Sequence, residues 1–196
     1  CDRPGCPADA PARARASRSP ISATATPAAH PTSAPTSAAP GRCGSASPPI
    51  TAPVVAGGAV YVAEKNRHVL HALTARDGGR RWTFGADGRV DSPPTIVGGL
   101  CLFGTRGGSV YCLRASDGEL AWRFRALPDR TICAYGRLES AWPVCGSILV
   151  KDDLAYFAAG RNSFTDGGIF LFALDPRSGK VVHQNRMYGP FGENGF

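Results

Sequence analysis

Short runs of alternating hydrophobic and polar residues begin near residue 51 and recur to about residue 185. Residues 59–63 and 68–73 are two such runs, and Asp77-Gly78 follows them as a strong hairpin signal. A hydrophobic period of two residues is typical of half-buried β-strands. The pattern therefore predicts short antiparallel strands joined by tight turns.

The strand pattern repeats, and each copy ends with a turn glycine that is followed four positions later by a residue with a large ring. Gly78 is followed four positions later by Trp82, and Gly118 by Trp122 in the same way. A third copy has Gly179 but ends on a histidine where the first two have tryptophan. A period of about 40 residues with four short strands per unit is the signature of propeller blades. We expect an all-β fold, a partial β-propeller of about three four-stranded blades in which these glycines and tryptophans are structural.

The chain divides into a tail and three repeats. The tail or linker is 1–50, the first blade 51–91, the second blade with an insertion 92–140, and the third blade with the start of a further segment 141–196. The tail is nearly all Ala, Pro, Ser, Thr and Arg, which bury too little apolar surface to offset ordering, so we expect disorder. Three blades do not close a ring, because propellers have about four to eight. We therefore expect the remaining blades of a longer protein to be partners.

The charge of the chain suggests a nucleic-acid partner at first sight, because the net charge is +7 and arginine supplies 19 of the 22 basic residues. The arginines are scattered through tail, turns and repeats, however, and form no run or helical stripe. This distribution argues against nucleic-acid binding. No apolar stretch has the length of about 18 residues that would predict a transmembrane helix.

The cysteines do not follow a metal or redox pattern. Their number, 7, is odd, and no pair has the spacing of a zinc ribbon, a redox motif or a c-type haem site. Cys101 and Cys112 flank a tight turn at Arg106-Gly107. If Thr105 pairs with Gly108, the two cysteines lie directly opposite each other on neighbouring strands. We favour two packed thiols over a disulfide, since free cysteine is among the most buried residue types.

The repeat ends resemble a known family, the pyrroloquinoline-quinone-like (PQQ-like) repeat propellers, whose pattern is Ala-x-Asp-x-x-Thr-Gly-x-x-x-Trp. The first copy keeps Ala72, Gly78 and Trp82, the second keeps Gly118 and Trp122, and the third keeps Ala173, Asp175 and Gly179. Residues 85–183 are similar to large PQQ-binding-like propeller proteins of planctomycete-type bacteria. The family includes BamB-like outer-membrane assembly factors and quinoprotein dehydrogenases, and its members are mostly exported.

Three functions fit the resemblance and the insertions together. The first is a non-catalytic binding or scaffold module of an exported bacterial protein. The second is a fragment of a PQQ-dependent quinoprotein dehydrogenase, and the third is a carbohydrate- or peptide-binding propeller. A quinoprotein needs a cation held by carboxylate and amide oxygens and usually a vicinal Cys-Cys pair, which this sequence lacks. We therefore favour a non-enzymatic role without cofactor, with PQQ and calcium supplied only by missing blades, and a periplasmic or cell-envelope location. Cys1 begins either a fragment or an acylated lipoprotein tether.

Function is expected where the copies depart from one another. One insertion covers 125–144 and another 160–167. Insertions in repeat arrays map to loops, often on the binding face. The candidate ligand-binding residues are Arg137, Glu139, Trp142, Arg161 and Asn162. The alternative, which the sequence favours, is structural: Glu139 pairs with Arg137 and Trp142 packs under its loop.

Other polar residues are interpreted as turn or strand residues. Asp87-Gly88 is expected to be a hairpin turn, and Asp152-Asp153 stands where the first two repeats have Gly-Gly. His68 and His71 would point to opposite faces of a strand and so would not share a metal ion.

Overall fold

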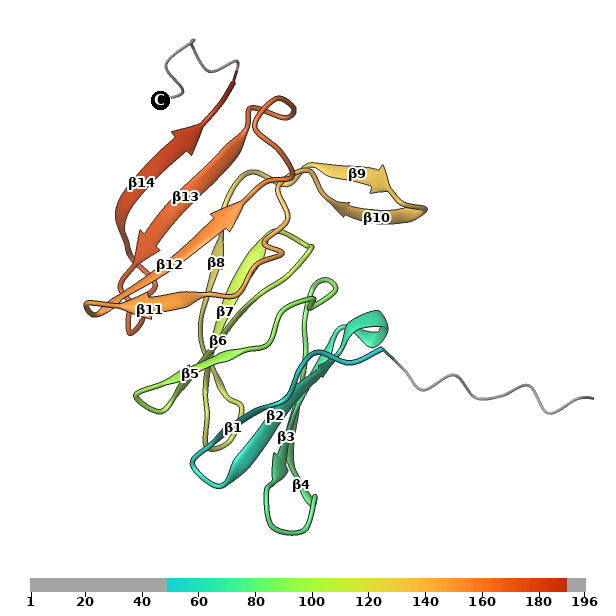
Figure 1. The fold of residues 1–196 in the computed structure, drawn as a ribbon, viewed down its shortest axis with the longest axis vertical. Helices are drawn as coiled ribbons and strands as arrows, with labels where there is room; N and C mark the ends of the chain where they lie inside the picture. Colours follow the sequence, from blue (N-terminus) through green and yellow to red (C-terminus); the bar gives the residue numbers. More distant parts are fainter. Residues whose placement is uncertain (1–48, 190–196) are drawn as a thin grey trace, which may run out of the picture. The chain divides into compact units, whose positions relative to one another are not determined.

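The computed structural model describes residues 49–189, which form three four-stranded antiparallel sheets and one hairpin (Figure 1). The first sheet contains β1 (Val54–Ala56), β2 (Ala59–Glu64), β3 (Val69–Thr74) and β4 (Arg80–Gly85). The second contains β5 (Thr95–Val97), β6 (Leu100–Gly104), β7 (Ser109–Arg114) and β8 (Leu120–Arg125). The third contains β11 (Leu149–Lys151), β12 (Leu154–Ala159), β13 (Ile169–Leu174) and β14 (Val181–Met187). The prediction of an all-β fold with three four-stranded blades is confirmed.

Each sheet is a meander whose strands pair in sequence order, so we call the sheets blades 1, 2 and 3. The turn between the first two strands has two residues with positive φ in every blade: Gly57-Gly58, Gly98-Gly99 and Asp152-Asp153. Positive φ at both central residues is the type I′ geometry, which matches the twist of a two-residue hairpin. The aspartates of blade 3 are therefore exposed turn residues in a conformation that glycine adopts more easily.

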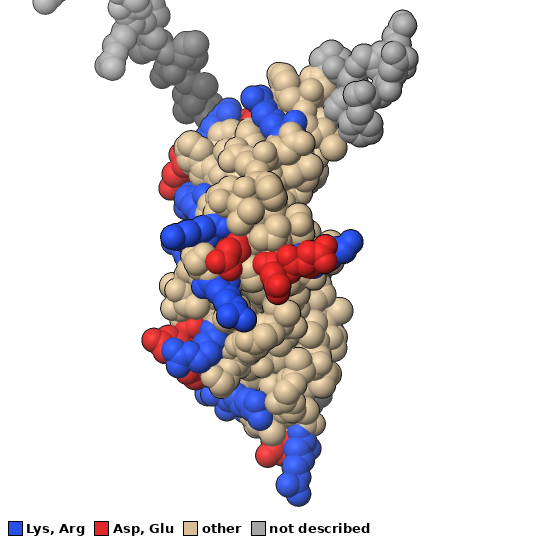
Figure 2. Space-filling model, turned by 90° about the vertical axis from the view of Figure 1, so that its left-hand side faces the viewer, with Lys and Arg blue, Asp and Glu red and all other residues tan. Residues whose placement is uncertain are grey.

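Each blade has an inner edge, formed by its first strand, and an outer edge, formed by its last strand. Strand β5 contacts both β1 and β11 across the blades, so the first strands of the three blades lie on the same side. These inner strands carry Lys151 as their only charged residue, whereas the outer strands β4 and β8 carry two arginines each and β14 carries one. Figure 2 shows charged side chains gathered along one margin of the face in view, and the opposite margin is largely free of them.

Neighbouring blades pack face to face through two hydrophobic cores. In the first, Phe103 and Tyr111 of blade 2 stack with ring centroids 5.3 Å apart, and Phe84 of blade 1 meets them edge-on. The second repeats this trio: Phe157 and Phe172 of blade 3 stack at 5.3 Å, and a phenylalanine of β8, Phe124, meets them edge-on. Stacked and edge-on rings add to the stabilisation that burial of their apolar area provides.

A tryptophan from each preceding blade covers a glycine of the next. Trp82 donates its indole N–H to the carbonyl of Ala115 at 3.0 Å, and a Cβ on Gly118 would lie 2.6 Å from its ring. Trp122 donates to the carbonyl of Pro176 at 2.9 Å, and a Cβ on Gly179 would lie 2.7 Å from its ring. The repeated Gly and Trp therefore meet between blades, each Trp on the Gly of the following repeat.

The register of β6 and β7 differs by one residue from the predicted register. Cys101 pairs with Leu113, and Cys112 pairs with Leu102. The turn has three residues, because Thr105 N donates to the carbonyl of Ser109. The prediction that Cys101 and Cys112 lie directly opposite each other was therefore wrong. Both thiols are free and buried, one in each inter-blade core.

Two further local predictions are corrected. Asp87-Gly88 lies in the connection from β4 to β5 between blades and does not form a hairpin turn. The insertion expected to be a loop contains a hairpin of β9 (Thr131–Ala134) and β10 (Arg137–Ser140). The two-residue turn Tyr135-Gly136 has positive φ at both positions, which again gives the type I′ geometry.

The predicted tail lies almost wholly outside the described residues. Within them, Ile50 already bridges to Glu64, and the Thr51 hydroxyl accepts a hydrogen bond from Ala63 N at 3.0 Å. Residues 49–189 contain no helix long and apolar enough to cross a bilayer.

The tryptophan–glycine contact yields a matched test. Gly78 and Gly118 have nearly the same φ, 72° and 76°, but a Cβ on Gly78 would meet nothing within 4 Å. Gly78→Ala therefore incurs only left-handed strain, about 1–2 kcal/mol. We expect Gly118→Ala to lose about 1–3 kcal/mol more, since its methyl group overpacks against Trp82. Urea unfolding at low protein concentration measures both values, and equal losses would contradict the contact.

Candidate functional site

The candidate site is built from the loops at one end of blade 2. The β6–β7 turn is held by backbone hydrogen bonds on both sides: Arg106 N donates to the carbonyl of Arg89, and Ser140 N donates to the carbonyl of Arg106, each at 2.9 Å. The insertion continues this network, since Val144 N donates to the carbonyl of Thr105. The backbone thus fixes the inter-blade connection, the turn and the insertion against one another.

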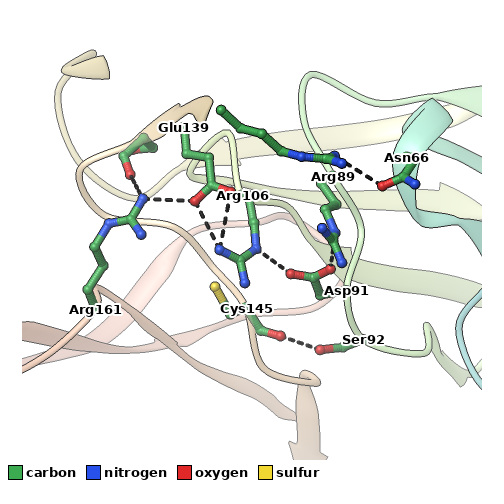
Figure 3. Close-up of polar contacts among 10 residues, drawn as sticks. Asn66, Arg89, Asp91, Ser92, Arg106, Glu139, Cys145 and Arg161 are labelled. Carbon is green, nitrogen blue, oxygen red and sulfur yellow. Dashed lines mark hydrogen bonds and ion pairs between the residues drawn. The ribbon is translucent and has the colours of Figure 1, made fainter. Parts of the chain in front are cut away.

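Arg106 is the centre of the polar contacts in Figure 3. Its Nε donates to Asp91, and its Nη1 donates to both carboxylate oxygens of Glu139, at 3.2 and 2.9 Å. The hydrogen bond to Asp91 raises the pKa of Arg106 above its usual range, and Glu139 adds to this against the opposing effect of burial. Arg106 therefore stays charged and joins two segments that are far apart in the sequence.

Glu139 is a buried carboxylate shared by two arginines. Its side chain is only 6% exposed, and Arg161 Nη2 donates to its Oε2 at 2.9 Å while also donating to the carbonyl of Ser140 at 3.1 Å. A buried charge is tolerated only when it is paired and hydrogen-bonded. The structure pairs Glu139 with Arg106 and Arg161, whereas the structural alternative expected Arg137.

Asp91 completes the cluster from the connection between blades 1 and 2. Arg89 Nε donates to its Oδ1 at 2.5 Å, and Arg106 binds its other oxygen. Burial alone would raise the pKa of Asp91, but the hydrogen bonds and charges of Arg106 and Arg89 outweigh burial and hold the pKa below its usual value. Cys145 lies beside Arg106 (Figure 3), and burial raises the pKa of its thiol, which is therefore protonated at neutral pH.

A cavity of about 390 Å³ opens beside this cluster. Its lining includes Arg89, Arg106 and Arg137, together with Glu139 and the backbone of Gly107. Arg137 Nη1 donates to the side-chain oxygen of Asn66 at 3.0 Å, so the insertion reaches across to blade 1. Because the partner of Arg137 is a neutral amide, this contact leaves its charge uncompensated.

The other two predicted site residues hold their loops in place. Trp142 donates its indole N–H to the carbonyl of Asp166 at 2.6 Å, and the guanidinium of Arg130 lies over its ring. The Asn162 side-chain oxygen accepts from the backbone N–H groups of Phe164 and Thr165, both at 2.9 Å. Trp142 joins the two insertions, and Asn162 caps the second. The structure brings Glu139 and Arg161 together, and leaves Arg137, Trp142 and Asn162 with separate partners.

Sequence reasoning missed several residues of this region. Asp87 accepts hydrogen bonds from the hydroxyls of Thr105 and Ser109 and from Arg123 Nη2, all at 2.6 Å. Arg106 was treated only as a turn residue. The one usable signal was the departure of Gly-Arg-Val-Asp-Ser-Pro-Pro, residues 88–94, from the surrounding strand pattern.

The described residues do not fit the cation site that a quinoprotein needs. Glu139 faces two guanidinium groups, and the oxygen of Asn162 is occupied by its own loop. The described residues contain no group of three or more His, Cys, Asp or Glu side chains arranged to hold a metal ion. His71 instead contacts Glu64 at 2.9 Å, and His68 ends the short 3-10 turn Lys65–Arg67.

The hairpin β9–β10 presents two large hydrophobic side chains to solvent. Tyr135, in the turn, is 93% exposed, and Leu138, on β10, is 79% exposed. Figure 1 shows this hairpin projecting away from the three blades. Its base is tied down by the hydrogen bonds of Ser140, and the contact of Arg137 with Asn66 ties the end next to the turn to blade 1. The arrangement is a fixed arm that carries aromatic, aliphatic and cationic groups.

The buried Glu139 generates a prediction about stability. Glu139→Gln removes the charge between Arg106 and Arg161 but preserves the shape of the side chain. We expect a loss of about 2–4 kcal/mol in the free energy of unfolding, because two largely buried guanidinium groups lose their counter-charge. Glu119→Gln is the matched control, since its ion pair with Arg114 is exposed and contributes less than about 1 kcal/mol. Equal losses in chemical denaturation would contradict the role of Glu139.

Asp91 generates a prediction about pH. A carboxylate with a lowered folded-state pKa contributes stability above the unfolded pKa of about 3.9, and this stability is lost as pH falls through the folded value. We expect the difference in unfolding free energy between the native chain and Asp91→Asn to shrink from about pH 5 downward. A difference that stays constant down to acid pH would show that the ion pairs of Asp91 do not stabilise the fold.

Comparison with known proteins agrees with this architecture. The family model described as outer membrane protein assembly factor BamB matches residues 11–196. BamB of Yersinia pestis is 28% identical over 138 residues, which are 68% of this chain and 32% of that protein. The chain therefore spans about a third of the length of this curated relative.

Solved structures show the same fold. The crystal structure of BamB from Moraxella catarrhalis matches with a TM-score of 0.50 and 21% identity, over 66% of this chain and 34% of that one. The quinohemoprotein alcohol dehydrogenase of Comamonas testosteroni matches with a TM-score of 0.57 and 20% identity, over 69% of this chain and 20% of that one. With its three blades of PQQ-like repeats and a family match over nearly its whole length, the chain belongs to the BamB-like family of PQQ-repeat β-propellers.

Proposed function

We propose that this chain is a non-catalytic, protein-binding scaffold of the bacterial cell envelope, and that the hairpin β9–β10 is its principal contact arm. The observation that carries the proposal is the exposure of Tyr135 and Leu138 on a hairpin whose base is fixed. Tyrosine and arginine are enriched among residues that dominate protein interfaces. A fixed arm also loses little conformational entropy when it binds.

The charged cluster beneath the arm supports a structural rather than a catalytic role. Glu139, Asp91 and Asp87 are each engaged by arginines of the chain itself. A general base must be within hydrogen-bond reach of a substrate proton and must be free to accept it. Here the carboxylates hold the insertion in place, and the cationic Arg137 remains on the arm.

The family supports the envelope location. The matching family is named for outer membrane protein assembly. From that name we infer that this chain is exported to the periplasmic side of the envelope. The two readings of Cys1, a lipoprotein anchor or the start of a fragment, concern a residue outside the described range. Acylation of Cys1 would hold the chain at a membrane surface.

Site-specific photocrosslinking tests the arm. A benzophenone amino acid replaces Tyr135 in a chain exported to the periplasm of a Gram-negative host, and Glu119, whose exposed side chain lies between β7 and β8, serves as the control position. We expect discrete protein adducts from position 135 and none from position 119. Leu138→Asp should strongly reduce the adducts from position 135, because it removes a neighbouring apolar group of the arm. Indistinguishable adduct patterns from the two positions would rule out the arm as the contact site.

The competing enzymatic function has a separate readout. Titration calorimetry of the chain with PQQ and calcium should give no saturable heat. Saturable heat would favour the dehydrogenase alternative over a scaffold, independently of the crosslinking result.

A further inference from the structure

The cavity of about 390 Å³ beside the charged cluster lies under the arm. Residues 87–89 line it from the connection between blades 1 and 2, and Arg106-Gly107 line it from the β6–β7 turn. Residues 137–139 of β10 form the side next to the arm, and His68 of blade 1 completes the wall. The cavity is therefore bounded by blade 1, blade 2 and the insertion, which hydrogen bonds hold together.

The two carboxylates in the wall are already neutralised by arginines of the chain. Asp87 binds Arg123 Nη2 at 2.6 Å. Glu139 binds Arg106 and Arg161, each at 2.9 Å, and its side chain is only 6% exposed. A carboxylate that is buried and paired in this way contributes little free negative charge to the cavity. The cavity is therefore poorly suited to a cation.

The arginines of the wall, in contrast, keep unused donors. Arg89 donates only through Nε, to Asp91, so both of its Nη nitrogens make no hydrogen bond within residues 49–189. Arg137 donates within the same range only through Nη1, to the neutral side chain of Asn66. A guanidinium group has five N–H donors, accepts no hydrogen bond and stays charged. The wall therefore contains cationic donors that have no acceptor from the chain.

Positive charge also exceeds negative charge in this region. The guanidinium groups outnumber the carboxylates that they bind: Arg89, Arg106, Arg123, Arg137 and Arg161 stand against Asp87, Asp91 and Glu139. The side chains of Arg89 and Arg106 are only 29% and 24% exposed. Salt and water screen such partly buried charges less than charges on the surface. An anionic group is therefore favoured in the cavity.

An apolar border narrows the kind of anion. Leu138 lines the cavity and is 79% exposed, and Tyr135, in the turn of the same hairpin, is 93% exposed. A free inorganic anion would leave both side chains in water. A peptide segment with an acidic residue beside an apolar one would occupy the cavity and cover the border together.

We propose that the cavity binds a carboxylate side chain of the protein that the arm contacts, with Arg89 and Arg137 as donors and Leu138 against the adjoining part of the same segment. The inference rests on the proposed function, because it specifies the arm's partner as an acidic segment. Hydrogen bonds between guanidinium and carboxylate groups are about twice as strong as neutral ones. Arg89 keeps its bond to Asp91 through Nε, so the bound carboxylate adds to the cluster without breaking it.

Titration of the ¹⁵N-labelled chain with a capped tetraglutamate peptide tests the cavity directly by NMR at constant ionic strength. We expect saturable shifts of the backbone amide signals of Gly88 and Gly107, which line the cavity. Capped tetraglutamine is the matched probe without charge and should give no saturable shift. Sodium glutarate and inorganic phosphate, titrated in the same way, represent free anions and should bind at least about threefold more weakly than tetraglutamate.

Arg137→Gln removes one cation but keeps a side-chain N–H that can donate to Asn66. We expect the dissociation constant for tetraglutamate to rise about tenfold, as for the loss of one charge-assisted hydrogen bond. Arg67→Gln is the matched control, because it removes the same charge from an exposed side chain outside the cavity wall, and it should leave the dissociation constant unchanged. Arg89→Lys preserves charge but not the Nη donors, so it should weaken binding severalfold.

Photocrosslinking from position 135 tests the same site with the natural partner. Its adducts should decrease in the Arg137→Gln chain and persist in the Arg67→Gln chain. If position 135 gives no adducts at all, the proposed function fails, whereas the peptide titration still decides whether the cavity binds carboxylate. Adducts that persist in the Arg137→Gln chain would leave the arm as the contact site and would overturn the acidic segment as its partner.

Three results of the titration would contradict the proposal. Tetraglutamine that shifts the same amides with the same affinity would show that charge is not recognised. Equal effects of Arg137→Gln and Arg67→Gln would indicate general attraction to a basic chain. Glutarate or phosphate that binds as tightly as tetraglutamate would assign the cavity to a free anion.

Discussion

The arrangement of the blades depends on one contact, the indole ring of a preceding blade lying on a glycine of the following blade. The ring occupies the space that a Cβ would need, and its N–H satisfies a carbonyl of the same turn. The glycine is therefore required twice, once for its positive φ and once for the absence of a side chain. In both contacts the tryptophan belongs to the preceding blade and the glycine to the following blade. The two faces of a blade are therefore not equivalent, because one supplies the tryptophan and the other supplies the glycine turn.

The charged cluster has a different role: it attaches a long insertion to a repeat whose turns are short. Arg106 stands in the β6–β7 turn and binds a carboxylate from the preceding connection and another from the insertion. A single guanidinium can do this because its donors point in several fixed directions. The insertion is thus anchored by charge as well as by the burial of Ala141 and Val144, and its hairpin projects from a fixed base.

The sequence predicted the fold because the signals of a propeller blade are local. Strand period, turn residues and the spacing from Gly78 to Trp82 all lie within one repeat, and they repeat. The site was harder to predict, since Arg106 and Glu139 are 33 residues apart and meet only after the insertion folds back. Glu139 and Arg161 were chosen because they lie in insertions, but Arg106, the second arginine that binds Glu139, stood in an ordinary turn. The register of β6 and β7 was missed by one residue, because a Gly-Gly pair permits a two-residue or a three-residue turn equally well.

That one-residue difference in register places Cys101 and Cys112 on opposite faces of blade 2. Cys101 faces the core shared with blade 1, and Cys112 faces the core shared with blade 3. Burial raises the pKa of the Cys101 thiol to about 12 and that of Cys112 to about 11, so both are unreactive while the cores are closed. Modification of either thiol by an alkylating reagent therefore requires the opening of a particular interface. Blade 2 therefore has one buried thiol at each of its two interfaces, and alkylation of each thiol reports the separation of blade 2 from one neighbouring blade.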